Sequence, residues 1–284
     1  MHKRLATFLA VCLLLAMVPA VMQGQDGPPK VISITQEFVK PGQGPAHEKW
    51  EASWNQALIR AKVPVRTLTV TSVTGGNEIW FINGYASFAD WEKGGKAFEA
   101  PAISSVMDQY MPKETEFLSE ARTLVAVYRP DLSFHPGIKL GEMRYFNVRS
   151  TRVRDGHGDE YEEIMKLVNS ARESGNVDVH VAVFQVVSGL TGTNYLSFIT
   201  MKSAAEMDQP SNLMNALGDE GRKKLNQLVE KSVAASNVRL YAFSPRLSYP
   251  TDAMMAEDPA FWKPKPAPMA AKPAAKKEAE TPKQ

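Results

Sequence analysis

The stretch VKPGQG at residues 39–44 returns in altered form as VRDGHG at residues 153–158, 114 positions further along the chain. Each stretch follows an alternating apolar segment and opens a segment with helical spacing. Each copy then closes on a short apolar strand and the pattern Pro-x-Leu-Ser, at residues 130–133 and 245–248. A repeat of this length is a globular unit and not a solenoid period, so the sequence predicts a duplicated domain.

Both copies have the same order of expected elements: strand, helix, strand, strand, helix, strand. In the first copy these are residues 31–39, 45–61, 65–73, 78–85, a helix that starts at Ser87 with Asp90 as its capping partner, and 123–128. In the second they are residues 142–149, 159–174, 177–187, 195–201, 219–235 and 238–243, with an additional helix start at Ser203. The order predicts the α+β class, with two tandem ferredoxin-like β-α-β-β-α-β units. Each four-stranded sheet has a bare face that the other copy can cover.

The strand-to-helix junction, with Lys-Pro-Gly in the first copy and Arg-Asp-Gly in the second, resembles the dimeric α/β-barrel superfamily. The likeness is to its NIPSNAP-like and antibiotic-biosynthesis-monooxygenase-like branches, and it covers about residues 30–248. Members of that superfamily pair the sheets of two ferredoxin-like units into a barrel. The resemblance therefore implies an intramolecular pseudo-dimeric α/β barrel, either as a monomer or within a higher oligomer. Its motifs are structural, so it implies a fold and no particular reaction.

These patterns divide the chain into five parts. They are a signal peptide (1–24), a first ferredoxin-like repeat (30–133), a linker (134–141), a second repeat (142–248) and a C-terminal extension with a disordered Lys/Pro/Ala tail (249–284).

The N-terminus predicts export. Lys3 and Arg4 precede an almost wholly apolar run over residues 5–22, and small residues follow at Ala20 and Gly24, as in a secretory signal peptide. The alternative is an uncleaved anchor, because the run approaches the length that a bilayer needs. The mature protein would be periplasmic or secreted, and it would lack cysteine because the single cysteine of the chain lies within this run.

Charge argues against a nucleic-acid partner. Without Lys3 and Arg4 the chain has 31 basic and 31 acidic residues, and the tail alone carries six Lys and two Glu. The folded part is therefore acidic, which does not suit a polyanion. The Lys-rich tail suits loose contact with an anionic envelope surface. Phe261 and Trp262 either pin the root of this tail to the body or form an exposed anchor for a partner.

The first candidate site is a cleft between helix and sheet in the first copy. One helix face there presents an imidazole and two indoles, and the facing strand positions are polar where the second copy has valine. The predicted ligand-binding residues are His47, Trp50, Trp54, Thr67, Thr69 and Asn83. In an enzyme, His47 would accept a proton. The alternative is a packing face with a hydrogen-bonded His47 at its margin.

The second candidate site is the barrel interior, lined by Asp178, His180, Arg239 and Tyr241. Asp178 and His180 are two positions apart on one strand, so the carboxylate could orient the imidazole as a general base. The alternative is that these groups close the seam between the two sheets through hydrogen bonds and ion pairs.

Two classes of function follow. The first is an exported protein that binds a small apolar molecule, in its enzymatic form a cofactor-independent oxygenase or isomerase acting on a planar substrate. The second is a non-catalytic envelope scaffold. No cofactor is predicted; haem-handling members of the superfamily hold their ligand in the same cleft, and His47 could ligate haem if the cleft were open. No metal site is predicted, because the five histidines have no zinc-type spacing.

Overall fold

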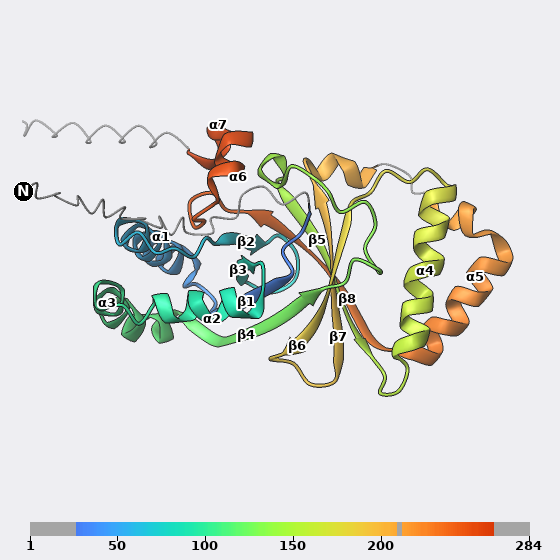
Figure 1. The fold of residues 1–284 in the computed structure, drawn as a ribbon, viewed down its shortest axis with the longest axis horizontal. Coiled ribbons are helices and arrows are strands. Elements are labelled where there is room, and N and C mark those ends of the chain that lie inside the picture. The colour runs from blue at the N-terminus through green and yellow to red at the C-terminus, as the bar shows by residue number, and fades with distance from the viewer. Residues whose placement is uncertain (1–26, 209–211, 264–284) are drawn as a thin grey trace, which may run out of the picture.

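The computed structural model describes residues 27–208 and 212–263, which form one closed barrel of eight strands (Figure 1). The strand order is β1-β3-β2-β8-β5-β7-β6-β4, and every neighbouring pair is antiparallel. Each half therefore keeps the strand order 4-1-3-2 of a ferredoxin-like unit. The predicted fold, two such units joined into a pseudo-dimeric barrel, is confirmed.

The strands are β1 (Val31–Val39), β2 (Leu68–Ser72), β3 (Glu78–Tyr85), β4 (Leu118–Tyr128), β5 (Tyr145–Val153), β6 (Val181–Ser188), β7 (Thr193–Met201) and β8 (Val233–Phe243). The helices are α1 (Gly44–Arg60), α2 (Phe88–Ala97), α3 (Pro101–Phe117), α4 (Gly158–Ser174), α5 (Leu213–Ser232), α6 (Asp252–Glu257) and α7 (Pro259–Trp262). Two 3₁₀ turns, η1 (Leu140–Glu142) and η2 (Ala204–Asp208), complete the described elements. Within the described ranges, no helix is long and apolar enough to cross a bilayer.

Alternate residues of each strand face two different environments. One set fills the barrel with large side chains, among them Ile34, Trp80, Phe198 and Tyr241. The other set faces the helices, with α1, α2 and α3 on one side of the barrel and α4 and α5 on the other (Figure 1). The helix-facing residues of β1 pack against α1 in the layer that contains α1, α2 and α3.

Each Pro-x-Leu-Ser segment crosses onto the opposite repeat. Residues 245–248 follow β8 and lie against β2, where the backbone N–H of Thr69 donates to Ser248 Oγ at 2.9 Å. Residues 130–133 follow β4 and occupy the same place on β6, where the N–H of Val183 donates to Ser133 Oγ at 3.0 Å. The central leucine of each segment is almost fully buried. This exchange locks the two halves together.

A matched asparagine receives each crossing segment. Asn55 on α1 donates to the carbonyl of Ser248 at 2.8 Å, and Asn169 on α4 donates to the carbonyl of Leu132 at 3.1 Å. Because the two asparagines are 114 positions apart, they are equivalent in the duplication.

Replacing Asn55 by alanine should lower the free energy of unfolding by about 1–3 kcal/mol, because the Ser248 carbonyl would be left unpaired at a buried place. Urea denaturation measures this loss. Gln56→Ala, one position away on the exposed side of α1, is the control and should change little. Equal losses in the two variants would contradict the role given to Asn55.

Several expected elements differ in extent from the structure. β4 and β8 each begin five residues before the predicted start, because their polar first halves pair with β1 and β5 without an apolar alternation to reveal them. β6 begins at Val181 and not at residue 177. The helix expected from Ser203 is the 3₁₀ turn η2, where Glu206 Oε1 accepts the N–H of Ser203.

The segment after residue 249 is structured as far as Lys263. Trp262 is buried, and its Nε1 donates to the carbonyl of Gly141 at 2.9 Å. The guanidinium of Arg144 lies 3.9 Å from the ring centroid of Phe261. The two aromatic residues therefore pin α7 to the barrel, and the interpretation of this pair as an exposed partner anchor is wrong. The predicted signal peptide (1–24) and the predicted disordered tail beyond Lys263 lie outside the described residues.

Candidate functional site

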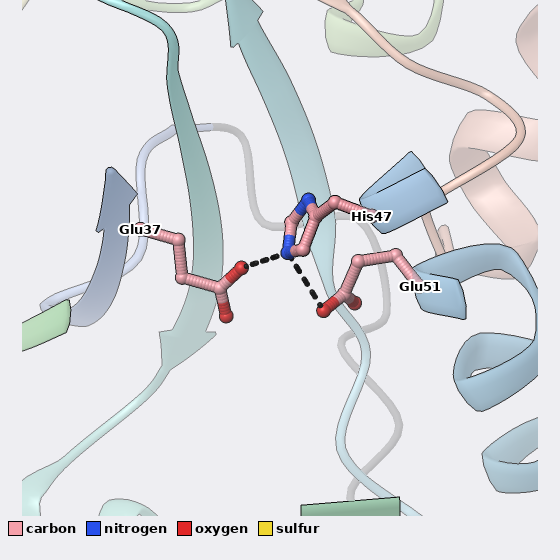
Figure 2. Close-up of side chains that lie close together, drawn as sticks. All are labelled: Glu37, His47 and Glu51. Atoms are coloured by element: carbon pink, nitrogen blue, oxygen red, sulfur yellow. Dashed lines mark ion pairs between the residues drawn. The ribbon is translucent and has the colours of Figure 1, made fainter. Parts of the chain in front are cut away.

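Three ionisable side chains of the first repeat converge in the layer between β1 and α1 (Figure 2). Glu37 lies on the helix-facing side of β1, and His47 and Glu51 lie one turn apart on α1. Glu37 Oε2 is 2.9 Å from His47 Nε2, and Glu51 Oε1 is 3.5 Å from the same nitrogen. One imidazole nitrogen is thus shared between two carboxylates.

The cluster is shielded from water. His47 is 0% exposed, and Glu37 and Glu51 are 4% and 3% exposed. Within the described part of the chain, both ring nitrogens of His47 and the Oε2 atom of Glu37 lack a hydrogen-bond partner of acceptable geometry. Buried polar atoms are normally paired, so atoms left open in this way point to a function.

A third carboxyl group, that of Glu114 on α3, adjoins the cluster and hydrogen-bonds to Glu37. Burial raises the pKa of Glu51 to about 9, with further contributions from the negative charges of Glu37 and Glu114. Burial also raises the pKa of Glu114 to about 7, with Glu37 as the second cause. Among the described residues, no lysine or arginine forms an ion pair with any of the three carboxylates. The site therefore holds more acid groups than its own positive charge can balance.

Aromatic rings pack around the imidazole. Trp50 is stacked 6.2 Å from His47 between ring centroids, and Phe117 meets it edge-on at 5.8 Å. Tyr110 joins Trp50 to Trp54, with centroids 6.0 and 5.5 Å away. Haem does not fit here, because the nitrogen that would bind iron faces two carboxylates within 3.5 Å and the ring is packed on its sides.

The second repeat has an uncharged version of the same layer. Thr151, Tyr161 and Met165 occupy the positions of Glu37, His47 and Glu51, each 114 residues later. Their side chains are buried, and the hydroxyl of Tyr161 hydrogen-bonds to Thr151. The fold therefore does not require ionisable groups at these positions.

The strand residues predicted for the first cleft do not contact His47. Thr69 is fully buried, and its Oγ1 donates to the carbonyl of Leu247 at 2.9 Å. Asn83 donates to Thr67 Oγ1 at 2.7 Å. The crossing segment at residues 245–248 covers β2, so the strand residues bond to that segment or to one another. Trp50 and Trp54 lie with His47 in the layer between α1 and α3.

The mouth of the barrel contains a separate cavity of about 250 Å³. Its wall is largely apolar and includes the polar residues His180, Arg66, Thr67, Thr200 and Glu257. Apolar side chains from six strands line it, namely those of Ile32, Leu68, Ile82, Phe146, Ala182 and Phe198.

Of the residues predicted for the barrel interior, only His180 lines this cavity. Its Nδ1 donates to the backbone carbonyl of His135 at 2.5 Å, since a carbonyl can only accept; in the neutral ring the lone pair is therefore on Nε2. The side chain of Asp178 is fully exposed and lies 4.0 Å from Nε2. The orienting group is therefore the His135 carbonyl, and the prediction that Asp178 performs this task is wrong.

Arg239 and Tyr241 lie away from the cavity, around Glu78 at the opposite end of β3. Glu78 is 1% exposed, accepts hydrogen bonds from Trp80 Nε1 (2.5 Å) and the Tyr241 hydroxyl (3.0 Å), and pairs with Arg239. The four predicted residues thus do not form one site. The pair Arg239 and Tyr241 instead closes the seam between the two sheets, which is the alternative left open for this set.

The comparison with known proteins supports the fold. No family model and no curated protein sequence matches the chain. A solved structure of a candidate monooxygenase from Fusobacterium nucleatum subsp. nucleatum is similar with a TM-score of 0.51 and 9% identity, over 76% of this chain and 93% of that one. The chain has the dimeric α/β-barrel fold in its tandem, single-chain form.

Two further solved structures are more distant. An anthrone oxidase-like protein covers 78% of this chain and 94% of its own length, with 15% identity and a TM-score of 0.48. A chlorite dismutase variant from Candidatus Nitrospira defluvii covers 80% and 95%, with 9% identity and a TM-score of 0.44. Identities this low show nothing about activity.

Proposed function

We propose that this is an exported protein that binds a small, mainly apolar molecule in the cavity at the barrel mouth. The observation that carries the proposal is the cavity itself, about 250 Å³ of largely apolar wall with a few polar groups. An apolar cavity of about 150 Å³ holds benzene, so this one suits a fused two-ring compound. The ligand site proposed from the sequence thus moves from the first cleft to the barrel mouth.

His180 gives the proposal an enzymatic form. His180 lines the cavity, and the His135 carbonyl holds the neutral ring in the tautomer whose Nε2 can accept a proton. A planar ligand with an acidic C–H or O–H would lose its proton to this nitrogen, as a cofactor-independent isomerase or oxygenase requires. The fold similarity to a candidate monooxygenase is compatible with this chemistry.

A substitution that fills the cavity tests the proposed binding site. Ala182→Phe places a ring in the barrel mouth and should weaken the binding of 1-naphthol, followed by its fluorescence, by at least about tenfold, or ~1.4 kcal/mol. Val187→Phe adds the same ring on the exposed part of the same strand and should leave binding unchanged. Equal affinity in both variants, or no binding by the unchanged chain, would favour the scaffold hypothesis.

The exported state is tested separately. The N-terminus of the protein recovered from the medium or the periplasm should begin after Ala20 or Gly24 when sequenced by mass spectrometry. A protein that keeps residues 1–24 in the membrane fraction would support the uncleaved anchor.

A further inference from the structure

We infer that Glu37, His47 and Glu51 form a binding site for one divalent first-row transition-metal ion, of the Mn²⁺, Fe²⁺ or Zn²⁺ type. The site lies between β1 and α1 (Figure 2) and shares no residue with the barrel-mouth cavity, so it does not depend on the function proposed above.

The spacing of the donor atoms suits a common ion. One oxygen from each carboxylate and one imidazole nitrogen all lie within 4.8 Å of one another, and Nε2 is 2.9 and 3.5 Å from the two oxygens. Ligands that bind one ion at ~2.0–2.2 Å stand about 2.8–4.3 Å apart. The three groups therefore need only small rotations to share an ion.

The buried atoms without a hydrogen bond also support a bound ion. Glu37 Oε2 and His47 Nε2 are close and buried, yet neither has a hydrogen-bond partner of acceptable geometry within the described residues. Their lone pairs are thus available to a third atom between them. An acidic cluster alone would be weak support, whereas a buried imidazole nitrogen that faces two carboxylates without a hydrogen bond of acceptable geometry supplies a specific donor.

The negative charge of the carboxyl groups favours a cation at this site. Glu37 and Glu51 face one imidazole, Glu114 adjoins Glu37, and no lysine or arginine pairs with these three carboxyl groups in the described part of the chain. A divalent ion would neutralise two of these charges. The hydrogen bond from Glu114 to Glu37 would then orient a ligand, which is the usual task of a group behind a metal site.

The ligand types narrow the choice of metal. Imidazole nitrogen suits zinc and iron, and carboxylate oxygen suits manganese and magnesium. One nitrogen with two carboxylates therefore favours Mn²⁺, Fe²⁺ or Zn²⁺ over Ca²⁺ and Mg²⁺, which prefer oxygen alone. No thiolate takes part, so copper(I) is disfavoured.

Direct metal binding tests the site. The full exported chain, stripped with EDTA and dialysed, is titrated with Mn²⁺, Zn²⁺ and Co²⁺, with Mg²⁺ and Ca²⁺ as comparison ions, and bound metal is measured by elemental mass spectrometry. We expect about one tightly bound transition-metal ion per chain, a rise of several degrees in the thermal midpoint, and visible Co²⁺ absorption from the buried site.

The second repeat supplies the matched variant. Glu37→Thr with His47→Tyr and Glu51→Met copies the residues of the second repeat into the first and should fold while losing the bound ion. Glu51→Gln keeps the shape of the side chain, removes one anionic ligand, and should weaken binding at least about tenfold. His135→Ala, which breaks an exposed His–Glu pair, is the control and should bind like the unchanged chain.

Two results would overturn the inference. One is that the unchanged, folded chain takes up none of the three transition ions stoichiometrically. The other is that the ion persists in both Glu51→Gln and the triple variant, because the metal would then lie elsewhere on the molecule.

Discussion

Leu132→Ala is expected to lower the free energy of unfolding by about 2–5 kcal/mol, the range for a fully buried leucine. The loss should be large for its position, because Leu132 belongs to a connection between two elements. Its side chain packs in the apolar cluster of the second repeat, with Tyr161 and Val183, although it follows the last strand of the first. Removing it opens a cavity at the junction of the two halves.

The duplication provides a second copy of this experiment. Leu247 is 2% exposed and packs with Val39 and Ile79 of the first repeat, so Leu247→Ala should show a loss in the same range. Met207→Ala, at a 56% exposed side chain, is the control and should stay within about 0.5 kcal/mol of the unchanged chain. Guanidinium denaturation followed by far-UV circular dichroism measures all three variants. If both leucine variants were as stable as the control, the crossing segments would not contribute to the stability of the core.

The fold could be predicted because the same sequence pattern occurs in both repeats. Two copies of the strand-turn-helix junction and two Pro-x-Leu-Ser endings predict the order of elements from the sequence alone. The crossing of those endings could not be predicted. It depends on which repeat each segment packs against, and a leucine flanked by proline and serine fits either neighbour equally well in the sequence.

The candidate sites were predicted only in part. Comparison of equivalent positions in the two repeats singled out His47 on the α1 face, and the structure places it beside two buried carboxylates. The partner acids were missed because two of them lie on other elements: Glu37 is on β1 and Glu114 on α3. The spacing of His47 and Glu51 at i and i+4, opposite an acid on the helix-facing side of the first strand, was the available signal.

The barrel interior shows the limits of alternation. Period two correctly placed His180 at an inward position, where it lines the cavity. It could not show that Asp178 lies beyond the end of β6, where the chain leaves the sheet and the carboxylate enters solvent. Nor could it show that Arg239 and Tyr241 lie near the other end of the barrel, because position along a strand axis depends on register across the sheet.

The metal-free protein is expected to lose stability as the pH rises from about 5 to 9, and Glu51→Gln should remove most of that loss. The pKa of Glu51 is about 9 in the folded chain and 4.5 as the reference for the unfolded chain, chiefly because burial disfavours its charge. A carboxyl group whose pKa is raised in the folded chain stabilises that chain fully below pH 4.5, and this contribution disappears as the pH rises through 9.

At about 1.4 kcal/mol per pKa unit, the loss in the free energy of unfolding amounts to several kcal/mol. Glu114, with its pKa raised to about 7, adds to the same trend; Glu37 adjoins both Glu51 and Glu114, and His47 adjoins Glu51. Urea denaturation in EDTA at pH 5, 7 and 9 measures the effect, and the exposed Glu116→Gln is the control. A flat profile for the unchanged chain, or an equally steep one for Glu51→Gln, would show that the buried carboxylates are already balanced by another group.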